Sequence, residues 1–197
     1  MTALVLASAS PARRNLLAAA GIAAEVVVSG FDESTVDVAE PATLCLVLAR
    51  AKAEAVAGRL TDGLVLGCDS VLDFEGAAFG KPADADEATR RWYAMRGRSG
   101  VLYTGHCLID VGTGKRAEAV AGTTVHFAEV TDAEVAAYVG TGEPLRVAGG
   151  FTIDGLGGPF IESIDGDHGN VVGLSLPLLR RLLGELGHRL TDLWGMG

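Results

Sequence analysis

A segment near the start of the chain combines two serines with two arginines, in the order Ser8-Ala9-Ser10-Pro11-Ala12-Arg13-Arg14. It follows a predicted strand and begins a predicted helix, so free backbone N–H groups point towards whatever lies beyond the helix start. Arginines in a first helical turn oppose the helix dipole, and a bound anion would reverse that effect. The segment therefore indicates phosphate binding, although a capped helix with solvated arginines gives the same pattern.

A carboxylate interrupts the apolar stretch at residues 64–72, where Asp69 stands between Cys68 and Ser70. A carboxylate inside an apolar strand is costly unless it is paired, binds a metal ion or lies at an open end. An aspartate in such a position can hold a magnesium ion or activate water. An exposed aspartate at a strand end or bulge explains the pattern equally well.

Three further charged residues give weaker signals. Lys81 lies between Gly80 and Pro82, in a rigid loop that either fixes an ammonium as a phosphate clamp or leaves it solvated. Glu33 belongs to an acidic pair in a polar stretch, and Lys52 belongs to a predicted long helix. Such residues usually lie on the surface, so neither indicates a site by itself.

The sequence lacks the motifs of several other hydrolase and nucleotide sites. It contains no Gly-x-x-x-x-Gly-Lys-Ser/Thr phosphate loop, no His-Glu-x-x-His zinc site and no Gly-x-Ser-x-Gly elbow. The four histidines, at positions 106, 126, 168 and 188, have no spacing typical of metal ligands. We expect them to be structural or surface residues.

Composition limits the classes of function. A chain of 197 residues with 49% hydrophobic residues fits one domain, or two lobes that share a cleft. The net charge of −9 argues against sequence-independent binding of DNA or RNA, which relies on a basic surface. A small anionic ligand stays compatible with this charge if positive groups or a metal ion are concentrated at one site.

No apolar run approaches the roughly 18 residues that a membrane span needs. Residues 3–7 are apolar, but the arginines follow them rather than precede them, so a buried strand is favoured over a signal peptide. The three cysteines are far apart and lie among aliphatic residues, which disfavours a disulfide framework or zinc site. These features predict a cytoplasmic protein that binds neither membrane nor nucleic acid.

Helices and strands are predicted to alternate irregularly. The patterns predict strands at residues 3–7, 25–28, 64–74, 101–111, 117–127 and 160–164. Helices are predicted at residues 11–20 (capped by Ser10), 41–58, 84–95 (capped by Asp84), a short one after Thr131 and 176–186. Two long adjacent strands in the middle favour a mixed sheet flanked by helices over a regular parallel barrel.

Taken in order, these segments resemble the Maf family, also called septum formation inhibitors, over nearly the whole chain. The resemblance rests on the following segments: Leu6-Ala7-Ser8-Ala9-Ser10-Pro11, Gly67-Cys68-Asp69-Ser70-Val71, Gly80-Lys81-Pro82, Met95-Arg96-Gly97-Arg98, Tyr103-Thr104-Gly105, Tyr138-Val139, Gly142-Glu143-Pro144, Ala148-Gly149 and Asn170-Val171-Val172-Gly173-Leu174. Each piece alone is weak, but the ordered set is specific.

The resemblance implies an α/β fold related to inosine triphosphate pyrophosphatases, with residues 1–197 forming one domain whose two lobes flank a central cleft. It implies hydrolysis between the α- and β-phosphates of nucleoside triphosphates, with Mg²⁺ or Mn²⁺ as cofactor. It further implies removal of non-standard nucleotides, a link to arrest of cell division, and a homodimer.

Roles carry over by position. The resemblance implies that Asp69 accepts a proton and that Glu33 is a second carboxylate beside it, both being candidate metal ligands. Lys81 is the corresponding catalytic lysine of the Gly-Lys-Pro turn. The residues that correspond to substrate-binding positions are Ser8, Ser10, Arg13, Lys52, Ser70 and Asp154.

The sequence departs from the family pattern at informative places. Ala12 replaces the first of two arginines, which Arg14 could partly replace, and Arg146-Val147 replaces an Asp-Lys pair. Ala12, Ser70 and Asp154 fall where subgroups differ in base preference, and they match neither the thymidine/uridine-triphosphate type nor the 7-methyl-GTP type. The base therefore stays open. The losses at Ala12 and Val147 also leave a second hypothesis, a nucleotide-binding regulator of cell division without significant catalysis.

Overall fold

The structure is a computed structural model that describes residues 3–195. Its centre is a seven-stranded mixed sheet in the order β2-β1-β3-β5-β6-β7, with β4 paired to β3. The strands are β1 (Leu4–Leu6), β2 (Ala24–Val26), β3 (Leu64–Phe74), β4 (Ala77–Phe79), β5 (Ser99–Asp110), β6 (Lys115–Phe127) and β7 (Ile161–Asp165). The α-helices are α1 (Pro11–Ala19), α2 (Pro41–Ala57), α3 (Ala85–Met95), α4 (Asp132–Gly140), α5 (His168–Val172) and α6 (Leu176–Glu185).

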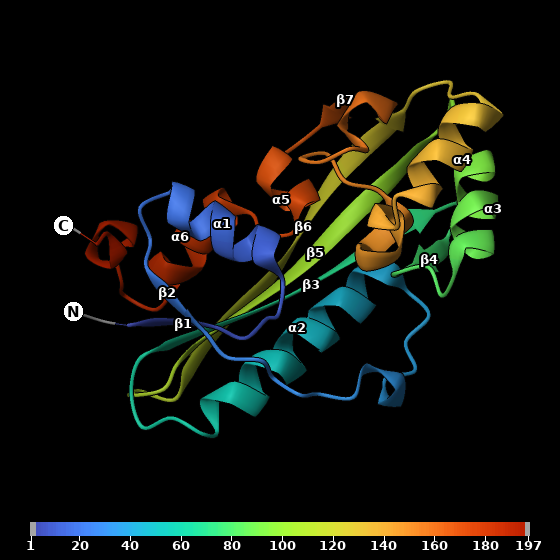
Figure 1. The fold of residues 1–197 in the computed structure, drawn as a ribbon. Coiled ribbons are helices and arrows are strands. Elements are labelled where there is room, and N and C mark those ends of the chain that lie inside the picture. Colours follow the sequence, from blue (N-terminus) through green and yellow to red (C-terminus); the bar gives the residue numbers. More distant parts are fainter. Residues whose placement is uncertain (1–2, 196–197) are drawn as a thin grey trace.

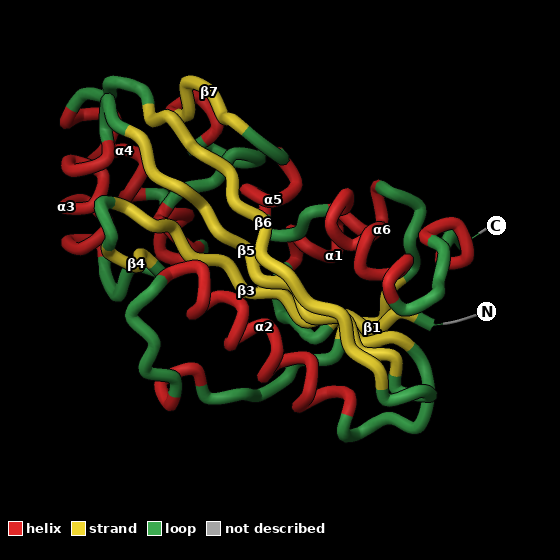
Figure 2. The backbone as a smooth tube through the Cα atoms, turned by 180° about the vertical axis from the view of Figure 1, so that it is seen from behind, coloured by secondary structure: helices red, strands yellow, loops and turns green. Residues whose placement is uncertain are grey.

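Three long antiparallel strands, β3, β5 and β6, connect the two ends of the molecule (Figure 1). At one end β1 and β2 extend the sheet in parallel, beside α1 and α6. At the other end α3 and α4 lie beside one another, near β4 (Figure 2). Helix α2 lies along the long strands and joins the two ends.

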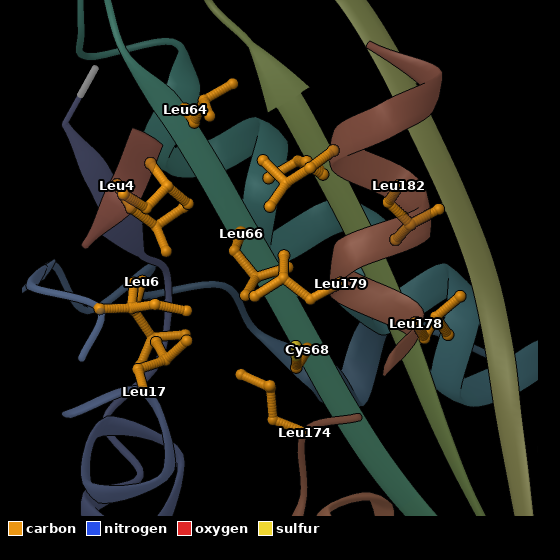
Figure 3. Close-up of a cluster of buried hydrophobic side chains, with 14 of the residues drawn as sticks. Leu4, Leu6, Leu17, Leu64, Leu66, Cys68, Leu174, Leu178, Leu179 and Leu182 are labelled. Carbon is orange, nitrogen blue, oxygen red and sulfur yellow. The ribbon is translucent and has the colours of Figure 1, made fainter. Parts of the chain in front are cut away.

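The hydrophobic core has three clusters of buried side chains. The first fills the space between β1, β3, α1 and α6, where leucines such as Leu6, Leu66 and Leu179 point towards one another (Figure 3). The second surrounds Trp92 of α3, whose indole N–H donates to the carbonyl of Gly150 at 2.9 Å. The third lies between α2 and the sheet. Each fully buried leucine stabilises the fold by about 1.5–3 kcal/mol.

Glycines allow α2 to lie unusually close to the sheet. A Cβ atom on Gly67 of β3 would overlap the backbone of Ala49, and one on Gly105 of β5 would overlap the backbone of Cys45. Both partners belong to α2. Any larger residue at either position would push the helix away from the strands, so these two glycines set the helix–sheet distance.

The predicted helices and strands are all present, with boundaries that differ by at most two residues. Ser10 caps α1 by accepting from the N–H of Arg13, and Thr131 forms a capping box with Glu134. Asp84 caps α3, but Glu87 accepts from the N–H of Ala83 rather than closing a box with Asp84.

One strand and one α-helix among residues 3–195 were not predicted. Strand β4 has three residues and owes its conformation to pairing with β3, and α5 has five residues capped by Asp167. Elements this short carry no periodic pattern. Within residues 3–195 no helix is both long enough and apolar enough to span a membrane. The thiols of Cys45, Cys68 and Cys107 are free and buried, and burial raises the pKa of each to about 12.

We predict that Gly105→Ala lowers the free energy of unfolding by about 2–3 kcal/mol, because α2 or the strand must move to accommodate the added methyl group. Gly184→Ala is the matched control, since nothing lies within 4 Å of the added carbon in α6. It should be neutral or slightly stabilising. Urea denaturation measures both, and equal effects of the two substitutions would contradict the close packing of α2.

Candidate functional site

A cavity of about 1200 Å³ lies between the start of α1, helix α2, the middle of β3 and the segment after α4. Every site residue predicted from the sequence contributes to its lining: Ser8, Ser10, Arg13, Glu33, Lys52, Asp69, Ser70, Lys81 and Asp154. These residues come from segments that are far apart in the chain. The fold therefore brings the predicted set together around one space.

The central feature of the cavity is a lysine shared by two carboxylates. Lys52 Nζ lies 2.5 Å from Asp69 Oδ1 and 2.7 Å from Glu33 Oε1. Lys52 and Asp69 are only 9% and 8% exposed, whereas the Glu33 side chain is 55% exposed. Burial raises the pKa of Asp69 above its ordinary value, and the positive charges of Lys52 and Arg13 act in the opposite direction. Asp69 is therefore a buried carboxylate whose ionised form depends on the neighbouring charge of Lys52.

Local structure explains why these three groups meet. Lys52 lies on the face of α2 that packs against the sheet, and the glycine contacts of that helix bring its ammonium to Asp69 on β3. Glu33 begins a short 3-10 helix, η1 (Glu33–Thr35), which Asp32 caps by accepting from the N–H of Ser34. In this helix Glu33 Oε1 lies 2.7 Å from Lys52 Nζ of α2.

Arg13, which the resemblance assigns to substrate binding, makes its hydrogen bonds to the protein itself. It is 8% exposed, and its guanidinium donates to protein acceptors on three segments. Nε donates to the carbonyl of Gly173 at 2.7 Å, Nη1 to Ser8 Oγ at 3.1 Å and the carbonyl of Cys68 at 2.8 Å, and Nη2 to Ser70 Oγ at 3.0 Å. Arg13 thus joins the start of α1, strand β3 and the residue after α5.

The first turn of α1 also offers less to an anion than the sequence suggests. Pro11 has no N–H, and the N–H of Arg13 is bound by Ser10 Oγ at 3.4 Å, so only the N–H of Ala12 is left free in that turn. Arg14 is exposed and does not line the cavity, so it does not replace the arginine missing at Ala12.

Three charged cavity residues have side chains that form no ion pair or hydrogen bond within residues 3–195. Lys81, Arg146 and Asp154 line the cavity, are exposed, and form neither an ion pair nor a side-chain hydrogen bond in that range. Lys81 lies in the Gly-Lys-Pro turn that follows β4. Two cations and one anion are therefore available to an occupant of the cavity.

Glu143, to which the sequence pattern assigns no role, binds the cavity segment at residues 152–157. Its carboxylate accepts from Tyr138 Oη at 3.0 Å, from Thr152 Oγ1, and from the N–H groups of Leu156 and Gly157 at 3.2 and 3.1 Å. These bonds fix the segment that carries Asp154. Glu143 stands in the Gly-Glu-Pro segment of the resemblance, but no spacing in the sequence connects it to residues 152–157.

The donor set at Glu33 and Asp69 fits a magnesium ion that is held mainly by phosphate. Their carboxylates both reach Lys52 Nζ and thus approach one another. Mg²⁺ is commonly bound through one or two carboxylates together with substrate phosphates and water. Among residues 3–195 no group of three or more His, Cys, Asp or Glu side chains is arranged to hold a metal ion. The protein would therefore supply part of the coordination shell and the substrate the rest.

One buried histidine lies behind the site. His106 Nε2 accepts from the N–H of Ser175 at 2.9 Å, so Nδ1 carries the proton and donates to the carbonyl of Thr104 at 3.0 Å. Burial lowers the pKa of His106 to about 4, and the nearby charge of Arg13 contributes. The imidazole is neutral at pH 7, and its hydrogen bond with Ser175 connects β5 to the start of α6.

We predict that Lys52→Met lowers the free energy of unfolding by about 3 kcal/mol at pH 7, because Asp69 is left buried without its cation. The double variant Lys52→Met/Asp69→Asn should recover part of this loss, since the unpaired charge is removed. Lys115→Met is the matched control, because Lys115 is exposed and forms no ion pair within the described residues. Chemical denaturation measures all three, and a double variant that is less stable than Lys52→Met would contradict the pairing.

The low pKa of His106 predicts acid sensitivity. The unfolded chain binds a proton at this residue below pH 6.5, whereas the folded protein does so only below about pH 4. Between those values the free energy of unfolding should fall as the pH falls, by up to about 3 kcal/mol from this residue. Denaturation from pH 7 to 4 should therefore show a weaker pH dependence for His106→Gln than for the exposed-site control His168→Gln. Parallel curves would show that His106 titrates normally.

Comparison with known proteins finds a family and relatives to which this chain is similar. Residues 3–186 match the family described as Maf-like protein. A protein of Salinispora tropica named nucleoside triphosphate pyrophosphatase is 65% identical, with 98% of this chain and 88% of that protein covered. One of the same name from Streptomyces avermitilis is 62% identical, with 97% and 94% covered.

A solved structure of the Ham1 protein of Staphylococcus aureus overlaps with a TM-score of 0.48 at 14% identity, covering 97% of this chain and 93% of that one. That similarity is too low to support an inference. The family match over almost the whole chain, together with relatives above 60% identity, shows that the chain belongs to the family of Maf-like proteins.

Proposed function

We propose that this protein is a nucleoside triphosphate pyrophosphatase, which hydrolyses the α–β phosphate bond to give a nucleoside monophosphate and pyrophosphate. The observation that carries the proposal is the contact of Lys52 Nζ with both Asp69 and Glu33 in the lining of a large cavity. The names of the relatives from Salinispora tropica and Streptomyces avermitilis agree with it.

The charges around the cavity suit a polyphosphate. Attack on phosphorus requires that the negative charge of the triphosphate is offset before a nucleophile approaches. Lys81 and Arg146 line the cavity without protein partners among residues 3–195, and Lys52 retains one N–H beyond those bound by its two carboxylates. These donors would bind the phosphate chain.

Asp69 is the best candidate for the proton acceptor. A carboxylate whose pKa is raised by burial is a stronger base than an exposed one, and the Lys52 contact favours its ionised form at neutral pH. In the proposed step the water oxygen bonds to the α-phosphorus while its proton passes to Asp69. The bond from the α-phosphorus to the bridging oxygen breaks, and pyrophosphate leaves with that electron pair.

A divalent cation, Mg²⁺ or Mn²⁺, is part of the proposal. When bound, it would supply positive charge to the phosphate oxygens during hydrolysis. Glu33 and Asp69 would hold it from the protein side. Glu33 suits this role because its side chain is more than half exposed and reaches the cavity from a short capped helix.

Finer properties stay predictions. The base that is preferred, the homodimer and a link with cell division follow only from the resemblance. The second hypothesis, a regulator that binds nucleotides without significant catalysis, is motivated by the absence of a cation at Ala12 and Val147, two positions that line the cavity.

We predict that Asp69→Asn reduces the turnover of every hydrolysed triphosphate by about 10²–10⁴-fold, the contribution typical of a positioned general base. The fold should remain, because asparagine has nearly the same shape. The measurement is release of pyrophosphate and monophosphate from a panel of standard and modified triphosphates, with Mg²⁺, Mn²⁺ or excess EDTA.

Wild-type turnover by Asp69→Asn would show that another group accepts the proton. No turnover of any triphosphate by the wild-type protein, together with measurable binding of one, would favour the regulator instead.

A further inference from the structure

Arg13 has almost no hydrogen-bonding capacity left for a ligand. A guanidinium has five N–H donors, and protein acceptors use four of them: the carbonyls of Gly173 and Cys68, and the hydroxyls of Ser8 and Ser70. The side chain is also 8% exposed. Arg13 must therefore affect a ligand mainly indirectly, by positioning the groups to which it is hydrogen-bonded.

The first of these groups, Ser8, is left with a free proton. Ser8 Oγ accepts from Arg13 Nη1 at 3.1 Å and from the N–H of Ser10 at 3.1 Å. A hydroxyl oxygen has two lone pairs, so both are used. The Ser8 O–H donates no hydrogen bond to another group among residues 3–195, and Ser8 lines the cavity. Its proton is therefore available as a donor to the cavity.

Ser70 has the opposite polarity. Thr104 donates its only hydroxyl proton to the carbonyl of Asn170 at 3.1 Å. The 2.9 Å contact between Ser70 and Thr104 then requires Ser70 to be the donor. Ser70 also accepts from Arg13 Nη2. Its proton is therefore donated to Thr104, one lone pair is used by Arg13, and one lone pair is left. Facing the cavity, Ser70 can only accept.

We infer that Arg13 is a positioning residue that fixes two cavity hydroxyls with opposite polarity. Ser8 is directed to donate to an anionic phosphate oxygen, and Ser70 is directed to accept from a hydroxyl or N–H donor of the nucleotide. This inference rests on the proposed function, since it concerns the same cavity. It assigns Arg13 an indirect role in place of direct phosphate binding.

A double-mutant cycle tests the Arg13 step. Ser8→Ala, Arg13→Gln and the double variant are compared by kcat/KM for pyrophosphate release, and by calorimetric binding of inorganic tripolyphosphate with Mg²⁺. A hydrogen bond to a charged oxygen predicts a loss of about ten- to a hundredfold for Ser8→Ala. If Arg13 acts through Ser8, the double variant should be no worse than Arg13→Gln within about threefold. Losses that multiply would overturn the inference.

Thr104 provides a test that does not require the loss of Arg13, which could unfold the chain. Thr104 is fully buried and does not line the cavity, and Ser70 is the cavity-lining residue whose side chain it hydrogen-bonds. Thr104→Val removes the acceptor of the Ser70 proton, and Thr104→Ser preserves it. We expect Thr104→Val to raise KM about fivefold while kcat stays within twofold of the wild-type value. Thr104→Ser should have the wild-type KM and kcat. Identical KM values for the two variants would overturn the polarity assigned to Ser70.

The two levels of failure are distinguishable. A wild-type protein that neither hydrolyses triphosphates nor binds tripolyphosphate would overturn the proposed function and this inference together. An active wild-type protein whose Ser8 and Arg13 losses multiply would leave the proposed function standing and remove only the indirect role of Arg13.

Discussion

The contact between Lys52 and Asp69 is the interaction on which the site depends. A carboxylate this deeply buried is unfavourable unless a cation lies beside it, and Lys52 Nζ supplies that cation at 2.5 Å. The contact requires α2 to lie close to β3 and β5, which Gly67 and Gly105 permit. Backbone geometry and electrostatics are therefore coupled, because the same glycines that set the helix position also bring the lysine to its partner.

The charged residues around that pair differ in what they contact. Arg13 binds protein acceptors and fixes hydroxyl groups, whereas Lys81 and Arg146 line the cavity and form no ion pair within the part of the chain that the structure describes. Glu143 orders another part of the lining through hydrogen bonds to Tyr138 and Gly157. The lining holds four basic and four acidic side chains, so the formal charge of the cavity is zero although the whole chain carries −9.

Much of the fold was predictable because its long elements carry strong patterns. The apolar stretch of β3, the Ser10-Pro11 start of α1 and the Pro41 start of α2 each predict an element that the structure contains. Strand β4 and helix α5 were missed, since three and five residues are too few to show a period and depend on tertiary contacts. The same limit applies to η1, whose position beside α2 no local pattern encodes.

The residues that line the cavity were more predictable than the contacts that each of them makes. The ordered motifs identified the residues that line the cavity, but residue type alone did not show that Arg13 faces the protein, that Arg14 lies outside, or that Glu143 organises a wall. Those facts depend on which acceptors the fold brings within reach. Whether Ser8 and Ser70 donate or accept in the cavity could not be predicted from the sequence either. These roles follow only from the complete set of hydrogen bonds around each hydroxyl.

The most direct measurement of the central interaction is the titration of the Asp69 carboxyl carbon by ¹³C NMR, in the wild-type protein and in Lys52→Met, without substrate. Burial predicts a wild-type midpoint above the ordinary aspartate value of 3.8. Removal of the neighbouring cation should raise the midpoint further, because Lys52 favours the ionised form. An unshifted midpoint in both proteins would contradict a buried carboxylate held in its charged form by Lys52.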